Sequence, residues 1–335
     1  MIAGRLLASL LPIVVFLIAL VFLDSFKLIK VQQLLALIVI GGLAAVVAFP
    51  INTSVFQGSS AHAYYYSRLV APLIEELLKG ACIVWLLANG YIAFMVDAAI
   101  FGFALGAGFV LVENTYYAGA LASDASSMVW LLRGFGLAIM HGGTTAMLGV
   151  IGSTAVNDRA ARKAARIAQG FIVAWAIHAF YNTSLFGPTV SAVLVIVGLP
   201  VVFALTFVRS EHALRNWLTE GMDADIELLS AISNDELANT NAGKYLATLR
   251  SRFSPELVAD MVCLLTLSAE VSMRAKGELM AREMGLKPAA DPELEGKLAE
   301  INSLQKNIGA TGKLALSPLR GQDGREFWQS HFLKN

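Results

Sequence analysis

The residues best able to do chemistry are ionisable side chains inside segments that are otherwise apolar. Placing a charge at membrane depth costs about 2.5–3.5 kcal/mol or more, so such residues are rarely kept without a partner, a pathway or a reaction that uses them. Four separate apolar segments each contribute at least one of them: Glu75, Glu76, Lys79, Glu113, His141 and His178. The pattern predicts a polar site built inside a bundle of helices.

The chemistry that these groups allow is hydrolysis. A carboxylate can act as a general base towards water, and an imidazole can share the proton transfer or stabilise an oxyanion. Asn182 follows His178 by four residues, so it shares a helix face with that histidine and its amide could donate to the oxyanion. Two histidines with a carboxylate also suit zinc, and such a centre would use Glu113, His141 and His178. The sequence has no HExxH motif, so metal-dependent and metal-free catalysis both stay open.

Glu75 and Glu76 cannot both point at one target, because adjacent helical residues point about 100° apart. Lys79 follows them by four and three residues and is within reach of either carboxylate. The economical arrangement has one glutamate facing the cavity while the other pairs with Lys79. Spacing does not determine which glutamate takes which role.

The composition describes the scaffold that must hold these residues. Of 335 residues, 56% are hydrophobic and only 15% are charged, which indicates an all-α, polytopic transmembrane helix bundle. Lys plus Arg and Asp plus Glu balance at 25 each, which argues against a nucleic-acid partner. About seven stretches approach the roughly 20 residues that a membrane-spanning helix needs. They lie near 6–23, 31–50, 70–88, 95–117, 128–151, 167–186 and 189–208.

Basic residues predict the orientation of the bundle. The loop 157–166 contains Arg159, Arg162, Lys163 and Arg166, so it should be cytoplasmic. Counting spans from there leaves the nearly base-free connection 52–67 outside and the C-terminal tail inside. We therefore expect a transmembrane domain over 1–208 in the cell (inner) membrane, which would contain the hydrolytic site, and a soluble, helical cytoplasmic domain over 209–335.

Helix rise predicts that the site residues meet at one depth. At 1.5 Å per residue, Glu75 and His141 each lie about 20 Å from the cytoplasmic ends of their helices, and His178 about 17–18 Å. Glu113 joins this level only if its helix starts near Asp97, which is a plausible N-cap. This level is slightly towards the outer face. Gly102, Gly106 and Gly108 have the small-residue spacing of close helix packing.

The tail carries its own helix signals. Ser254-Pro255-Glu256 is typical of a helix start, and Leu257, Met261, Leu264, Leu265 and Val271 follow at roughly helical spacing. A second helix is expected from Asp291-Pro292-Glu293 to Gly309. The tail shows no catalytic motif, which favours a regulatory module that binds a cytoplasmic partner or self-associates.

Four ordered motifs resemble those of PrsW-type intramembrane proteases, which are related to the CAAX prenyl protease and bacteriocin-processing superfamily. EELLK at Glu75–Lys79 matches EExxK, and FVLVEN at Phe109–Asn114 matches FxxxEN. MHGGTTAMLG around His141 and HAFYN at His178–Asn182 match the two histidine motifs. The resemblance covers roughly residues 70–190 and does not extend to the tail.

This resemblance implies an endopeptidase that cuts a single-pass membrane protein near its outer membrane boundary, for example an anti-sigma factor in regulated intramembrane proteolysis. It carries over catalytic roles to the acidic and histidine residues, with Zn²⁺ if the reaction uses a metal. The implied set is Glu75, Glu76, Glu113, His141 and His178, with Asn182 as oxyanion donor and Lys79 and Asp97 in support.

Two other functions fit parts of the pattern. Buried Glu and His chains also conduct protons, as in a proton-coupled transporter, although no matching motif pair recurs in two halves of the chain. A non-catalytic receptor or scaffold that signals through the cytoplasmic tail is the third interpretation.

Overall fold

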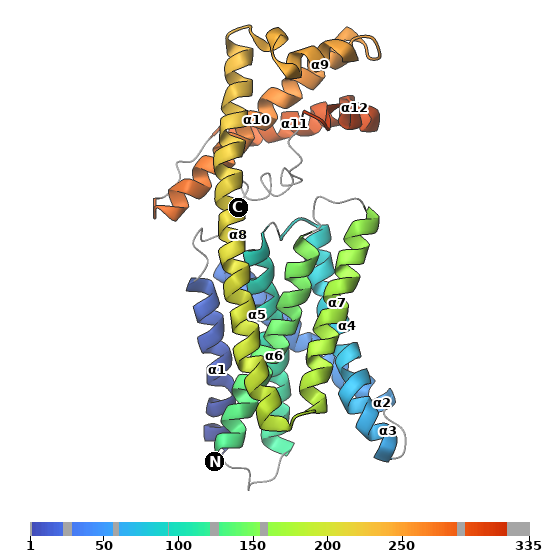
Figure 1. The fold of residues 1–335 in the computed structure, drawn as a ribbon, viewed down its shortest axis with the longest axis vertical. Coiled ribbons are helices and arrows are strands. Elements are labelled where there is room, and N and C mark those ends of the chain that lie inside the picture. The colour runs from blue at the N-terminus through green and yellow to red at the C-terminus, as the bar shows by residue number, and fades with distance from the viewer. Residues whose placement is uncertain are drawn as a thin grey trace. The chain divides into compact units, whose positions relative to one another are not determined.

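The computed structural model describes residues 2–22, 29–55, 60–92, 94–120, 127–154, 160–286 and 292–319. Within these ranges every regular element is a helix (Figure 1), which confirms the predicted all-α class for this part of the chain. The chain divides into two compact units, Met1–Ser210 and Glu211–Asn335.

The first unit is a bundle of helices. In chain order they are α1 (Ile2–Phe22), α2 (Val31–Val55), α3 (Ser60–Tyr65), the π-helix η1 (Tyr66–Val70), α4 (Ala71–Ala88), α5 (Met95–Ala120), α6 (Ser127–Ser153), α7 (Ala160–Thr183) and the first part of α8 (Pro188–Ser233). Four helices of the described chain are long and apolar enough to cross a membrane. They are α2, α5 over Met95–Tyr117, α6 over Gly134–Ser153, and α8.

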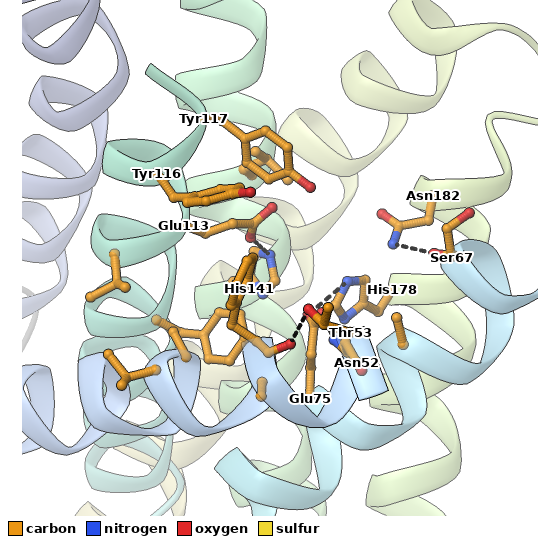
Figure 2. A pocket seen from close by; sticks show the side chains of 18 of the residues that line it. Asn52, Thr53, Ser67, Glu75, Glu113, Tyr116, Tyr117, His141, His178 and Asn182 are labelled. Carbon is orange, nitrogen blue, oxygen red and sulfur yellow. Dashed lines mark hydrogen bonds and ion pairs between the residues drawn. The ribbon is translucent and has the colours of Figure 1, made fainter. Parts of the chain in front are cut away.

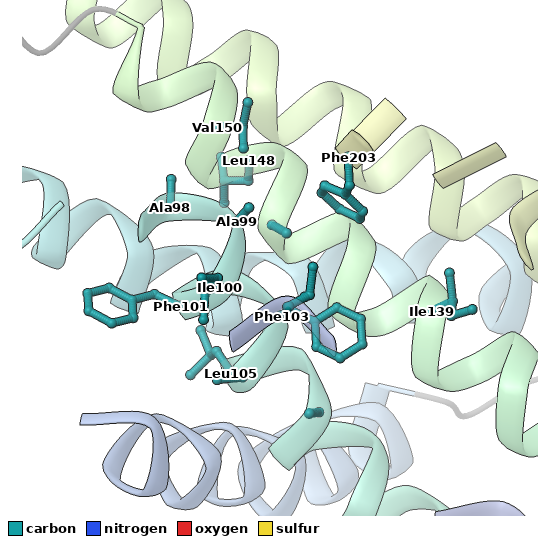
Figure 3. Packing of buried hydrophobic residues seen from close by; sticks show 14 of the residues in the cluster. Ala98, Ala99, Ile100, Phe101, Phe103, Leu105, Ile139, Leu148, Val150 and Phe203 are labelled. Carbon is teal, nitrogen blue, oxygen red and sulfur yellow. The ribbon is translucent and has the colours of Figure 1, made fainter. Parts of the chain in front are cut away.

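Helices α5 and α6 form the centre of the bundle. Their apolar side chains pack into one buried cluster (Figure 3), in which Phe103 and Leu105 of α5, Leu148 of α6 and Phe203 of α8 are at most 5% exposed. Helix α2 packs against α5, and α7 packs against α6. Helix α4 contacts both α6 and α7. The site residues of four helices therefore face a common interior.

Glycines allow the central helices to approach closely, as their spacing predicted. A Cβ atom on Gly102 would lie 2.5 Å from the Cα of Ala146, and one on Gly106 would overlap the carbonyl of His141. Both contacts join α5 to α6. A Cβ on Gly108 would overlap the carbonyl of Ile38 on α2. Because no larger residue fits at these points, the glycines fix the distance between the helices that carry the site.

The outer surface of the bundle is apolar. Leu11 and Val15 of α1, Val39 of α2 and Val197 of α8 are all more than half exposed. In water such a surface would be unfavourable. It suits contact with lipid chains, because the backbone polar groups are satisfied within the helices.

The predicted connection 52–67 is helical where the structure describes it, because α2 continues to Val55, and α3 and η1 follow from Ser60. The sequence SAHAYYYSRLV contains neither Gly nor Pro, so nothing in it breaks a helix. Asp97 is not the N-cap of α5 but lies in its first turn, where Oδ2 accepts a hydrogen bond from the amide of Phe94 at 3.1 Å. In a capping box, the side chain of the third helical residue accepts a hydrogen bond from the amide of the N-cap residue, and Asp97 makes this contact with Phe94.

The predicted cytoplasmic loop 157–166 is also largely helical. Helix α7 begins at Ala160, so Arg162, Lys163 and Arg166 lie on its first turns, while Arg159 lies outside the described residues. Ala-rich sequence between the basic residues favours this longer helix.

The second unit contains the remainder of α8, η2 (Leu237–Asn239), α9 (Asn241–Leu249), α10 (Pro255–Glu283), α11 (Leu294–Asn307) and α12 (Gly309–Leu316). The predicted helix start is confirmed: Ser254 caps α10 by accepting a hydrogen bond from the amide of Leu257, and Pro255 is its first residue. The following apolar stripe is buried at Met261 and Leu264. Helix α11 starts at Leu294, slightly later than predicted, and Asp291 lies outside the described residues.

Candidate active site

A cavity of about 620 Å³ opens among the helices of the first unit (Figure 2). Its lining includes five residues that the sequence singled out, namely Glu75 of α4, Glu113 of α5, His141 of α6, and His178 and Asn182 of α7. The remaining walls are mostly small or aromatic, including Ala45, Phe49, Phe109, Tyr116 and Tyr117. Four helices thus bring these five residues together around one pocket.

Glu76 is the fully buried member of the glutamate pair, and one of its oxygens contacts three neighbouring side chains. Its Oε1 accepts a hydrogen bond from Lys79 Nζ at 2.6 Å, and it lies 2.8 Å from His178 Nδ1. Thr144 Oγ1 donates to the same oxygen at 3.1 Å. Since a carboxylate can only accept, Nδ1 of His178 carries the proton and Nε2 is directed elsewhere. Glu76 therefore orients His178, while Lys79 balances the charge of Glu76.

Glu75 takes the other role and faces the cavity. Its side chain is 15% exposed, and its Oε2 lies 3.7 Å from His178 Nε2. Its Oε1 accepts a hydrogen bond from Asn52 Nδ2 at 3.2 Å. The two adjacent glutamates therefore point in different directions, as helix geometry requires. Glu75 faces the pocket, and Glu76 forms the ion pair with Lys79.

His141 is held on both ring nitrogens. Nε2 lies 2.8 Å from Glu113 Oε2, and Nδ1 lies 3.2 Å from Lys79 Nζ. An ammonium group only donates, so Nδ1 accepts from Lys79 and Nε2 donates to Glu113. The ring also stacks on Phe109, with ring centroids 5.0 Å apart. Glu113 reaches the site because α5 begins at Met95, close to the start that the depth argument required.

Asn182 lies on the pocket wall but bonds away from the carboxylates. Its Nδ2 donates to the carbonyl of Ser67 at 3.2 Å, as Figure 2 shows. Trp175, on the same helix α7, donates Nε1 to the carbonyl of Leu69 at 2.9 Å. Both acceptors lie in η1, and π-helical segments often occur at functional sites. Two α7 side chains therefore attach the π-helix to the rim of the pocket.

Three residues that contact the site were not predicted from the sequence. Asn52 and Thr144 each touch one of the paired glutamates, and Tyr66 OH donates to Asn52 Oδ1 at 3.1 Å. Thr144 had a signal, since it follows His141 by three residues. Asn52 and Tyr66 lie in the segment that was expected to be a connection, so no helix face could be assigned to them.

The donor atoms suit a divalent metal ion. Glu75, His141 and His178 each offer one ligand atom, and these atoms lie within 4.8 Å of one another. Two imidazoles and one carboxylate form a familiar zinc set, and the contact from Glu76 to His178 Nδ1 is the outer-shell support that such histidines usually have. Binding at His141 Nε2 would require the proton now donated to Glu113 to leave. From the sequence we predicted Glu113 as the carboxylate ligand. Among the described residues, the carboxylate whose oxygen lies close to both histidines is that of Glu75.

Comparison with known proteins agrees with this geometry. No curated protein and no solved structure is similar enough to the chain to count as a match. The family model described as PrsW family intramembrane metalloprotease matches residues 30–208. The match covers more than half of the chain and includes every helix that lines the pocket. The chain therefore belongs to the PrsW family of intramembrane metalloproteases.

Proposed function

We propose that this protease hydrolyses a peptide bond of a membrane-anchored protein inside the 620 Å³ pocket, near the outer boundary of the membrane. The observation that carries the proposal is that ligand atoms of Glu75, His141 and His178, which all line that pocket, lie within 4.8 Å of one another. The substrate that the family resemblance suggests is a single-pass protein such as an anti-sigma factor.

The proposed roles follow from the contacts of each side chain. A divalent metal ion held by Glu75, His141 and His178 would polarise the scissile carbonyl and acidify the attacking water. Glu113, 25% exposed to the pocket, accepts the proton of that water and returns it to the leaving amine. Asn182 donates to the oxyanion once substrate displaces its bond to Ser67. Glu76 and Lys79 hold His178 and His141 in place.

The proposed membrane topology has seven spans. Helices α4 and α7 are not among the four candidates, and α4 carries three charged residues, Glu75, Glu76 and Lys79. Both helices nevertheless pack against α6 within the same bundle. The described apolar part of α1, Leu10–Phe22, supports a further span. Placing the basic start of α7 on the inside gives a multi-pass protein of the inner membrane with its C-terminal domain in the cytoplasm. That domain would bind a cytoplasmic partner or a second copy.

The proposal is tested by mapping protein N-termini in cells that express the wild-type chain or His178→Ala. His212→Ala serves as the matched control, because His212 is exposed on α8. We expect new N-termini near the outer ends of single-pass transmembrane segments with the wild type and the control, and their absence with His178→Ala. Identical N-termini in all three strains, together with pH-dependent ion flux in liposomes, would instead support the transporter interpretation.

A further inference from the structure

We propose that Asn52 and Tyr66 are positioning residues that hold the Glu75 carboxylate in its reactive orientation. This inference rests on the proposed function, because it concerns how the carboxylate of that site is aimed. Both residues lie before the EELLK segment, and neither belongs to a motif on which the family resemblance was based.

The two carboxylate oxygens of Glu75 have different neighbours. Oε1 accepts from Asn52 Nδ2 at 3.2 Å, while Oε2 faces His178 Nε2 at 3.7 Å (Figure 2). A glutamate side chain has three rotatable bonds and a broad terminal torsion. Fixing one oxygen therefore directs the other towards the histidine. Without Asn52, the carboxylate could turn into the cavity, where it is already 15% exposed.

The Asn52 amide is itself held in one orientation. Tyr66 OH donates to Oδ1 of Asn52 at 3.1 Å. An asparagine amide has an acceptor side and a donor side, so occupying the oxygen from Tyr66 leaves Nδ2 pointing at Glu75. Tyr66 therefore supports Glu75 through Asn52, as the second member of a short chain of hydrogen bonds.

Helix α2 cannot easily shift relative to the site. A Cβ on Gly41 would overlap the carbonyl of Leu105, so α2 and α5 touch through their backbones. Further along α2, Ala45 and Ala48 are buried against Phe109, whose ring stacks on His141. The packing that supports the histidine thus also places Asn52 above Glu75.

Four variants of the purified full-length protein test this chain of hydrogen bonds. They are Asn52→Ala, Asn52→Asp, Tyr66→Phe and the double variant Asn52→Ala with Tyr66→Phe. Ser54→Ala and Tyr65→Phe are the matched controls. Among the described residues, the Ser54 hydroxyl bonds to its own helix, at the carbonyl of Ile51, and the exposed Tyr65 ring packs on Tyr64. The readouts are Zn²⁺ affinity by chelator competition, the visible spectrum of the Co²⁺-loaded protein, and kcat and KM on a substrate identified by N-terminal mapping.

We expect Asn52→Ala to weaken Zn²⁺ binding about 10-fold and to lower kcat with little change in KM, as for other outer-shell partners. Tyr66→Phe should weaken binding about 3-fold, the effect of one neutral hydrogen bond. The double variant should lose less than the sum of the two single variants, because Tyr66 and Asn52 belong to one chain of hydrogen bonds. Asn52→Asp, nearly identical in shape, should be the most damaging, since it replaces the donor by a like charge.

Several outcomes would overturn the inference: wild-type Zn²⁺ affinity and kcat in Asn52→Asp, or additive losses in the double variant. If Asn52→Ala fails to fold, Tyr66→Phe still decides the matter, because it removes one oxygen atom only. Glu75→Gln in the same assays tests the proposed function separately from the inference about Asn52 and Tyr66. Loss of function in Glu75→Gln with wild-type behaviour at Asn52 contradicts only this inference, whereas a fully active Glu75→Gln contradicts the proposed function.

Discussion

Replacing Glu75 by glutamine is expected to lower the rate of peptide hydrolysis by about 10³-fold or more. The carboxylate is the acidic member of the convergent group with His141 and His178, and a metal ion in such a site contributes several kcal/mol to the transition state. Glutamine keeps the size of the side chain and the capacity to accept from Asn52, so the fold should remain intact. The measurement is the cleavage rate of a substrate identified by N-terminal mapping.

The control for this variant is Glu220→Gln, the same chemical change at an exposed residue of α8. It should retain the wild-type rate. A Glu75→Gln protein that cleaves at the wild-type rate would show that the pocket carboxylate takes no part in the reaction.

Replacing Glu76 by leucine should damage both stability and activity. Glu76 and Lys79 are both 0% exposed, so loss of the carboxylate leaves a buried ammonium without its counter-charge. Breaking a buried pair in this way costs about 3–5 kcal/mol. His178 also loses the acceptor at Nδ1, 2.8 Å away, which should lower activity about 10–100-fold. Thermal unfolding in detergent and the cleavage rate measure the two effects.

A second substitution separates these effects. In the double variant Glu76→Leu with Lys79→Met, both charges are replaced by apolar groups, which is often neutral or stabilising. We expect the unfolding temperature to recover while activity stays low, because His178 still lacks its acceptor. Recovery of the wild-type cleavage rate would mean that Glu76 serves only to neutralise Lys79.

The sequence allowed the site to be predicted at the level of which residues meet. Helix rise placed Glu75, His141 and His178 at one depth, and in the structure their donor atoms lie within 4.8 Å of one another. The reason is that nearly straight, nearly parallel helices convert residue counts into heights. Glu113 followed the same rule, because the start of its helix was placed almost correctly.

The roles within the site could not be predicted in this way. Helical spacing allowed Lys79 to pair with either glutamate, and only the packing of α4 between α6 and α7 makes Glu76 the buried partner. Asn52 and Tyr66 were missed because hydropathy locates helices but not which helices are neighbours. Contacts between α2 and α5, set by Gly41 and Gly108, bring Asn52 to the site.

Measuring the metal content shows whether Glu75, His141 and His178 hold a metal ion. Purified wild-type protein, Glu75→Gln and Glu113→Gln are each analysed for bound zinc per chain. If Glu75, His141 and His178 hold the metal while Glu113 acts as the base, the wild type and Glu113→Gln should bind about one zinc. Glu75→Gln should bind little, and both variants should be inactive. Full zinc retention by Glu75→Gln with loss in Glu113→Gln, or a wild-type protein that is active without metal, would contradict the account.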